Sequence, residues 1–136
     1  MATRPAVTGT RVARRRVVAL AGFVLTVFAG LIVHTALPDT PATDIAGDAL
    51  YTAAIYGGIV VVAPRWSPGL VGAIAIGWCV AVELFQLTGL PVRWGEAWAP
   101  LMLVFGTVFD ARDLLIYVLT GLVLLAVDLA LARHRR

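Results

Sequence analysis

Carboxylic acids that interrupt apolar runs are the residues of this sequence best placed to do chemistry. Asp48 and Asp113 stand where two apolar runs begin, and Glu83 lies inside a third run. A carboxylate at the centre of a membrane helix costs about 2.5–3.5 kcal/mol on insertion scales, so an acid in this setting is a functional candidate by default. Such acids can bind a cationic ligand, or transfer a proton as general acid or base.

Polar partners accompany these acids at helical spacing. Gln86 follows Glu83 by three residues, and the acids at the other two runs are each followed within four residues by a tyrosine. Residues three or four apart share a face of a helix. The sequence therefore predicts a ligand-binding site in which each acid has a hydrogen-bonding neighbour: Asp48, Tyr51, Glu83, Gln86, Asp113 and Tyr117.

A structural role is the alternative for each acid. Asp48 and Asp113 are expected at helix N-termini, where free backbone N–H groups and the helix dipole favour negative charge, so capping alone would explain them. A protonated Glu83 that donates to Gln86 or to a tyrosine would link two helices. Such bonds average about 0.6 kcal/mol in membrane proteins, and this small gain favours a functional role for Glu83.

The composition determines which elements must position these side chains. Of the 136 residues, 60% are hydrophobic and 14% are charged, with a mean hydropathy of +0.91. Soluble domains contain about 45–50% apolar and about 25% charged residues. A membrane-spanning helix needs about 20 apolar residues, and a chain of this length and composition can supply four of them. The composition therefore predicts an all-α integral membrane bundle of four transmembrane helices rather than a soluble enzyme.

Four apolar runs supply the predicted spans. They cover residues 17–37, 48–63, 70–90 and 113–132, and together they make a membrane domain at 17–132 between basic tails at 1–16 and 133–136. Before the last span, residues 91–112 contain Trp94, Trp98 and an apolar piece at 101–109. Nine residues are too few to cross a membrane as a helix, so we expect a short interfacial or re-entrant segment there.

The distribution of arginines predicts the orientation. All eleven basic residues are arginine and the net charge is +3. With the N-terminus inside, nine arginines fall on the inner side, and only Arg93 and Arg112 fall on the outer side. The positive-inside rule therefore predicts a multi-pass protein with cytoplasmic N- and C-termini and with the acids in the outer half of the bilayer. The terminal arginine clusters are typical anchors for anionic headgroups, so membrane lipids are expected partners.

Several other classes of function have little support in the sequence. The basic clusters flank apolar runs instead of forming a binding face, so no nucleic acid partner is expected. There is no serine nucleophile motif, phosphate-binding loop or paired-histidine motif, and we predict no catalytic residue, cofactor or metal. A metal site of Cys79, Glu83 and His34 is conceivable, but no recognised ligand spacing supports it.

Three short motifs resemble those of a known family. They are Gly47-Asp48-Ala49-Leu50-Tyr51, Glu83-Leu84-Phe85-Gln86, and the run from Gly106 to Asp113 followed by Tyr117. In this order the chain resembles, over about residues 15–132, the small bacterial membrane proteins of domain of unknown function 2809, which are similar to the VanZ family. The resemblance implies a four-helix protein of the bacterial inner (plasma) membrane, with no established catalytic activity. VanZ-like proteins are associated with resistance to lipoglycopeptide antibiotics.

The leading hypothesis is a binding module for a cationic or lipid-linked amphiphile in an outward-facing acidic cleft. Tyr51, Tyr117 and the segment around Trp98 would line that cleft, and an acidic, aromatic site suits an amine-bearing ligand. Two alternatives remain open. One is an accessory subunit of a larger membrane complex, or a homo-oligomer, and the other is a membrane-embedded lipid-modifying enzyme with Glu83 as general acid or base.

Overall fold

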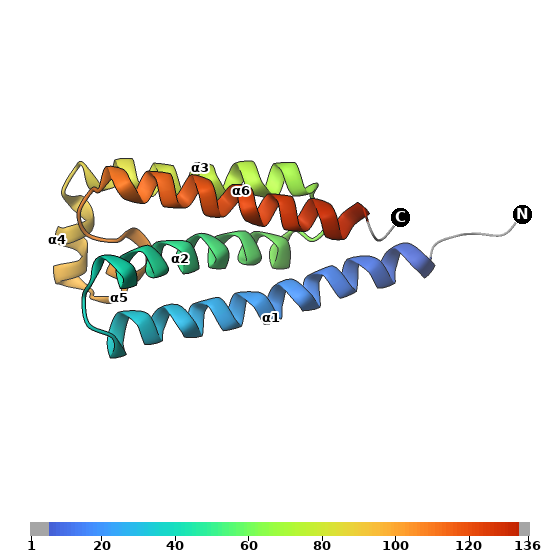
Figure 1. The fold of residues 1–136 in the computed structure, drawn as a ribbon, viewed down its shortest axis with the longest axis horizontal. Coiled ribbons are helices and arrows are strands. Elements are labelled where there is room, and N and C mark those ends of the chain that lie inside the picture. Colours follow the sequence, from blue (N-terminus) through green and yellow to red (C-terminus); the bar gives the residue numbers. More distant parts are fainter. Residues whose placement is uncertain (1–5, 134–136) are drawn as a thin grey trace, which may run out of the picture.

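The computed structural model describes residues 6–133, and in it four long helices lie alongside one another (Figure 1). These are α1 (Ala6–Ala36), α2 (Pro41–Val62), α3 (Pro68–Gln86) and α6 (Ala111–Arg133), and each is long and apolar enough to cross a membrane. The first residues of α1 and the last residues of α6 lie at the same end of the bundle. The all-α prediction with four membrane-spanning helices is confirmed.

The helix boundaries follow capping residues instead of the limits of the apolar runs. Thr40 caps α2 through a reciprocal pair of hydrogen bonds with Thr43, and Pro41 occupies the first turn, where its missing N–H is not needed. Asp48 was expected to begin this helix but lies two turns inside it, so helix capping does not explain Asp48. The helix α1 begins at Ala6, so most of the predicted basic tail at 1–16 is helical. Of the predicted tail at 133–136, only Arg133 lies within the described residues.

The long helices pack around α2. Both α3 and α6 contact α2 and each other, whereas α1 packs against α2 alone among the helices of the described chain. The buried core is small and includes Tyr56, Val60, Val71 and Ala75. Side chains on the far side of α1 are exposed, for example Leu25 at 68% and Phe28 at 64%, as expected for a surface that faces lipid.

Polar contacts close the bundle at the end where α1 begins. The Arg15 guanidinium forms an ion pair with Asp128 Oδ2 at 2.7 Å, and the Tyr56 hydroxyl donates to the same oxygen at 3.0 Å. Arg15 also donates to the carbonyl oxygens of Pro64 and Trp66, at 2.8 and 2.6 Å. We call Arg15, Tyr56 and Asp128 the arginine clasp, which joins α1 to α6 and to the α2–α3 turn.

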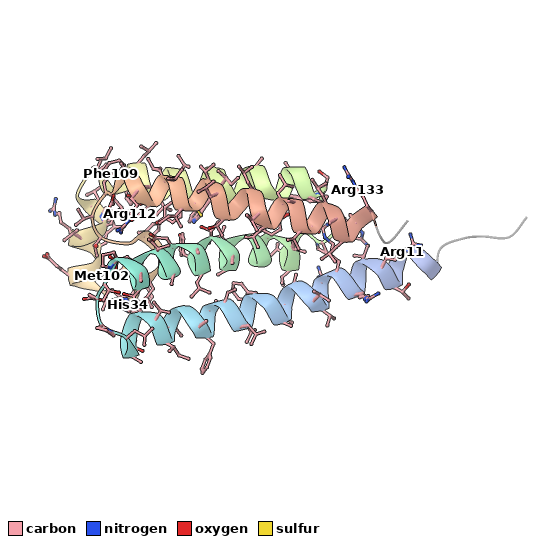
Figure 2. The ribbon with its side chains drawn as sticks, viewed as in Figure 1. Arg11, His34, Met102, Phe109, Arg112 and Arg133 are labelled. Carbon is pink, nitrogen blue, oxygen red and sulfur yellow. The ribbon has the colours of Figure 1, made fainter. Side chains whose placement is uncertain are left out.

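Two short helices lie across the opposite end of the bundle. These are α4 (Leu90–Ala97) and α5 (Pro100–Phe105), where the sequence predicts one interfacial segment (Figure 1). Trp98 adopts an extended conformation after α4, and Pro100 begins a new helix. We call residues 90–105 the α4–α5 cap. It packs on α3 through an aromatic cluster in which Trp94 and Phe105 contact Phe85, with ring centroids 5.3 and 5.8 Å away. Figure 2 shows His34, Met102 and Arg112 at this end and Arg11 and Arg133 at the other.

Candidate functional site

Three acids from three helices converge beneath the α4–α5 cap. Asp48 lies two turns into α2, Glu83 in the last turn of α3 and Asp113 in the first turn of α6. The carboxyl groups of Asp48, Glu83 and Asp113 are close enough to interact electrostatically with one another. We call these three acids and Tyr117 the acidic cluster.

Glu83 is the most enclosed member of the acidic cluster. Its side chain is fully buried, with 0% of its surface exposed. One carboxylate oxygen, Oε1, accepts a hydrogen bond from the backbone N–H of Asp110 at 2.6 Å. The other oxygen, Oε2, has no hydrogen-bond partner among the described residues. A buried acid normally has both oxygens satisfied, so half of this carboxylate is left free inside the protein.

The same deficiency extends to its neighbours. Three further buried acceptors lack a hydrogen-bond donor within residues 6–133, and they are Asp48 Oδ2, Asp113 Oδ1 and Gln86 Oε1. Each unsatisfied buried group costs about 1–3 kcal/mol, and more when it is charged. Two facing carboxylates also repel each other unless a proton or another cation lies between them. The acidic cluster therefore has an excess of acceptors and a shortage of donors.

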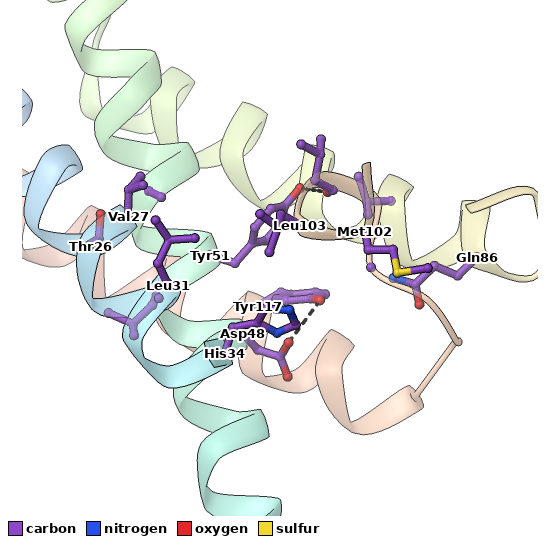
Figure 3. Close-up of a pocket in the computed structure, with 17 residues that line it drawn as sticks. Thr26, Val27, Leu31, His34, Asp48, Tyr51, Gln86, Met102, Leu103 and Tyr117 are labelled. Carbon is purple, nitrogen blue, oxygen red and sulfur yellow. Dashed lines mark hydrogen bonds between the residues drawn. The ribbon is translucent and has the colours of Figure 1, made fainter. Parts of the chain in front are cut away.

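Tyr117 supplies a weak donor to the cluster. Its hydroxyl donates to Asp48 Oδ1 at 3.4 Å, which is long for an O–H···O bond (Figure 3). The side chain is 5% exposed, and its ring lies 6.3 Å from the ring of Tyr51. This single long bond leaves the donor shortage of the acids unchanged.

Two of the predicted site residues fasten the α4–α5 cap to the bundle. The Tyr51 hydroxyl donates to the carbonyl oxygen of Val104 at 2.6 Å and accepts from the Trp78 indole N–H at 2.9 Å. Gln86 Nε2 donates to the carbonyl oxygen of Phe105 at 2.9 Å. Gly106, which follows, has a φ of 63°, and a Cβ at this position would collide with the Gln86 amide. Tyr51 and Gln86 thus hold the α4–α5 cap in place through hydrogen bonds to its backbone carbonyls.

A cavity of about 320 Å³ opens beside the acidic cluster, between α1, α2 and the α4–α5 cap. Its polar lining includes Asp48, Tyr117 and His34, and its apolar lining includes Leu31 and Leu103 (Figure 3). All of the predicted site residues line it except Glu83 and Asp113. A small polar region therefore adjoins a larger apolar surface provided by α1 and α5.

Arg112 is a residue of this region that the sequence analysis assigned only to the orientation. Its guanidinium lies 3.6 Å from the carboxylates of Asp110 and Asp113 and 3.7 Å from that of Asp44. These distances are too long for hydrogen bonds, and the buried Nε has no partner in the described chain. Arg112 therefore offsets part of the negative charge without satisfying the acceptors. The sequence signal for placing Arg112 at this site was its position directly before Asp113.

The acids are not arranged as a metal centre. No group of three His, Cys, Asp or Glu side chains in residues 6–133 could hold a metal ion. Cys79, considered above with Glu83 and His34, donates instead to the hydroxyl of Thr52, with a sulfur–oxygen distance of 3.9 Å.

Comparisons with known proteins identify a family. The family model described as "Protein of unknown function (DUF2809)" matches residues 37–121, which is more than half of the chain and contains all six predicted site residues. No curated protein and no solved structure matches the chain. The matched region begins just after α1 and ends within α6. The chain therefore belongs to the DUF2809 family.

Proposed function

We propose that the protein binds a cationic amphiphile, with the positively charged head at the acidic cluster and the apolar chain along the cavity. The observation that carries this proposal is the set of four buried acceptor oxygens without a donor, three of them on carboxylates. A primary ammonium group has three N–H donors and no acceptor, so it complements this set in charge and in hydrogen bonding. A neutral, hydroxyl-rich head on a lipid-linked sugar would supply donors but not charge.

The shape of the cavity supports an amphiphile over a small soluble cation. Asp48 and Tyr117 lie at one side of the cavity, and Val27, Leu31 and Leu103 provide apolar surface next to them. Because α1 packs against α2 but not against α5 within the described chain, the apolar part of the cavity opens between these two helices. A ligand already dissolved in the lipid bilayer would reach the acids by this route.

The proposal includes a location and an orientation. The arginine clasp end carries most of the arginines, and the positive-inside rule places that end in the cytoplasm. Both termini would then be cytoplasmic, and the acidic cluster would face the outer side of a bacterial inner membrane. A relationship to the VanZ family would fit this orientation. In this orientation the ligand site faces the side from which extracellular amphiphiles arrive.

Glu83→Gln tests the binding site, and Glu96→Gln, on the exposed side of α4, is the matched control. The probe is dodecylammonium, compared with dodecyl sulfate, added to the purified protein in nanodiscs. We expect Glu83→Gln to weaken dodecylammonium binding by about tenfold or more, because it removes the buried charge, while the control binds like the wild type. Equal binding of both probes by the wild type, or an unaffected Glu83→Gln variant, would contradict the proposal.

The two alternatives predict different outcomes for the same preparation. An accessory subunit would copurify in mild detergent with a larger membrane protein at fixed stoichiometry, and Glu83→Gln would leave that complex intact. A lipid-modifying enzyme would convert a lipid in the nanodisc to a new product, and Glu83→Gln would abolish the conversion. No contact within the described residues favours either alternative over ligand binding.

A further inference from the structure

A second concave surface meets the first at Ala54, extends from there to Trp66, and contains no acid. It is a groove of about 520 Å³ between α1 and α3, with α2 as its floor. Phe23 lines it on α1, Ile59 and Val62 on α2, and Ile74 and Trp78 on α3. Because α1 and α3 each pack against α2 but not against each other in the described chain, the space between them is left open. We call this the apolar groove.

The dimensions of the apolar groove match one leaflet of a bilayer. Its lining runs along α2 from Ala54 and ends at Ala63, the residue that follows this helix. Nine residues of helix rise by about 13 Å, which is close to half of the hydrocarbon thickness of about 30 Å. The groove ends at Trp66, whose side chain is 44% exposed, as is typical of a tryptophan at the membrane interface.

Water is a poor occupant of this groove, and a void would be costly. The lining offers few hydrogen-bond partners, whereas a buried water needs two to four of them. An empty groove would also forfeit the dispersion contacts of the side chains around it. An acyl chain satisfies both conditions because it supplies apolar contacts and requires no hydrogen bond.

Charge at the Trp66 end specifies the headgroup. Arg16 Nε donates to the carbonyl oxygen of Val61 at 2.9 Å, which fixes the exposed guanidinium next to Val62, a groove residue. The structure shows no further hydrogen bond from Arg16 to a described residue. A guanidinium can form paired hydrogen bonds with a phosphate. Arg65, also exposed, precedes Trp66 and adds positive charge to the same end.

We propose that the apolar groove binds one acyl chain of an anionic phospholipid from the leaflet at the arginine clasp end, with the lipid phosphate on Arg16. This site is separate from the acidic cluster in position and in charge, and it does not depend on the function proposed above. The lipid fills the gap between α1 and α3 and completes the packing of α1, whose close backbone contacts with other described helices are with α2.

The test measures lipid that remains bound to the purified full chain by native mass spectrometry, after incubation with equal amounts of phosphatidylglycerol and phosphatidylcholine. The wild type is expected to retain one phosphatidylglycerol in preference to phosphatidylcholine by about fivefold, the effect of about one arginine at a membrane surface. Arg16→Gln should retain a lipid but lose the preference. Arg14→Gln, a matched exposed arginine outside the groove, should behave like the wild type.

Two variants fill the groove itself. Ile74→Trp and Val62→Trp place bulk on groove residues that are 38% and 80% exposed, and Val123→Trp, 62% exposed on α6, is the control. Both groove variants should lose the retained lipid while the control keeps it. The proposal is wrong if the wild type retains both lipids equally, if both groove variants retain lipid like the wild type, or if the wild type is a dimer that the groove variants convert to monomers.

Discussion

The arginine clasp and the acidic cluster place similar groups at opposite ends of the bundle, but with opposite outcomes for their hydrogen bonds. At the clasp, Asp128 Oδ2 receives both the Arg15 guanidinium and the Tyr56 hydroxyl. In the acidic cluster, Asp48 receives one long bond from Tyr117, and its second oxygen receives none among the described residues. Each region brings together an acid and a tyrosine from neighbouring helices. Only in the clasp does the acid receive two short hydrogen bonds.

The difference separates structural from functional polarity. A buried carboxylate with its donors in place stabilises the packing of the helices that supply them. A buried carboxylate without donors destabilises the free protein, and a bound cation would offset that energy. The comparison therefore predicts that removing an acid has opposite effects on stability at the two ends.

The largest effect is expected from Asp128→Leu in the clasp. This change leaves the guanidinium of Arg15 without its carboxylate partner, and because the pair is only partly buried, the loss should destabilise by about 2 kcal/mol. The free energy of unfolding, measured by titration with sodium dodecyl sulfate in mixed micelles, checks this value. The double variant Arg15→Leu/Asp128→Leu should recover most of the loss. A single variant as stable as the wild type would remove the structural role of the clasp.

The two tyrosines offer a matched comparison of intermediate size. Tyr56→Phe removes a 3.0 Å bond to a charged acceptor and should lower the free energy of unfolding by about 1.5 kcal/mol. Tyr117→Phe removes a 3.4 Å bond and should lower it by less than about 0.5 kcal/mol, since so long a bond is weak. Equal losses in the same titration would show that the two ends do not differ as described.

The acidic cluster should also show an effect of the opposite sign. Asp48→Asn removes one of two facing carboxylates and introduces amide N–H donors beside Asp113, so the protein should become more stable by about 1 kcal/mol. The same variant should bind dodecylammonium less tightly than the wild type. Asp44→Asn, which changes an exposed acid near Arg112, is the control and should alter both quantities little. A destabilised Asp48→Asn variant would place Asp48 among the structural acids.

The main architecture was predictable because long apolar runs leave few alternatives to membrane-spanning helices. The exact ends were not, since they depend on short polar contacts such as the capping box of Thr40 and Thr43. For this reason Asp48 was expected at a helix start and in fact lies inside α2. The third predicted run ends at residue 90, whereas α3 ends at Gln86, where the chain turns through Gly89 with a φ of 68°.

The candidate site was predictable as a set of residue types but not as a set of contacts. The apolar settings of Glu83 and Asp113 identified them as unusual, and helical spacing associated Tyr117 with Asp113. The partner of Glu83 is the backbone N–H of Asp110, and backbone groups in a connecting segment leave no trace in the pattern of side chains. The pairing of Arg15 with Asp128 spans 113 positions, and only the folded bundle brings them together.

The arginine clasp also constrains the order in which the protein can be made. Arg15 lies on α1, whereas its partner Asp128 lies on α6, 113 positions later in the chain. During synthesis the guanidinium cannot form this ion pair until α6 has been translated. Because chains emerge at about 5–20 residues per second, the interval between the two residues is several seconds or longer. Final docking of the first helix must therefore be a late step of biogenesis.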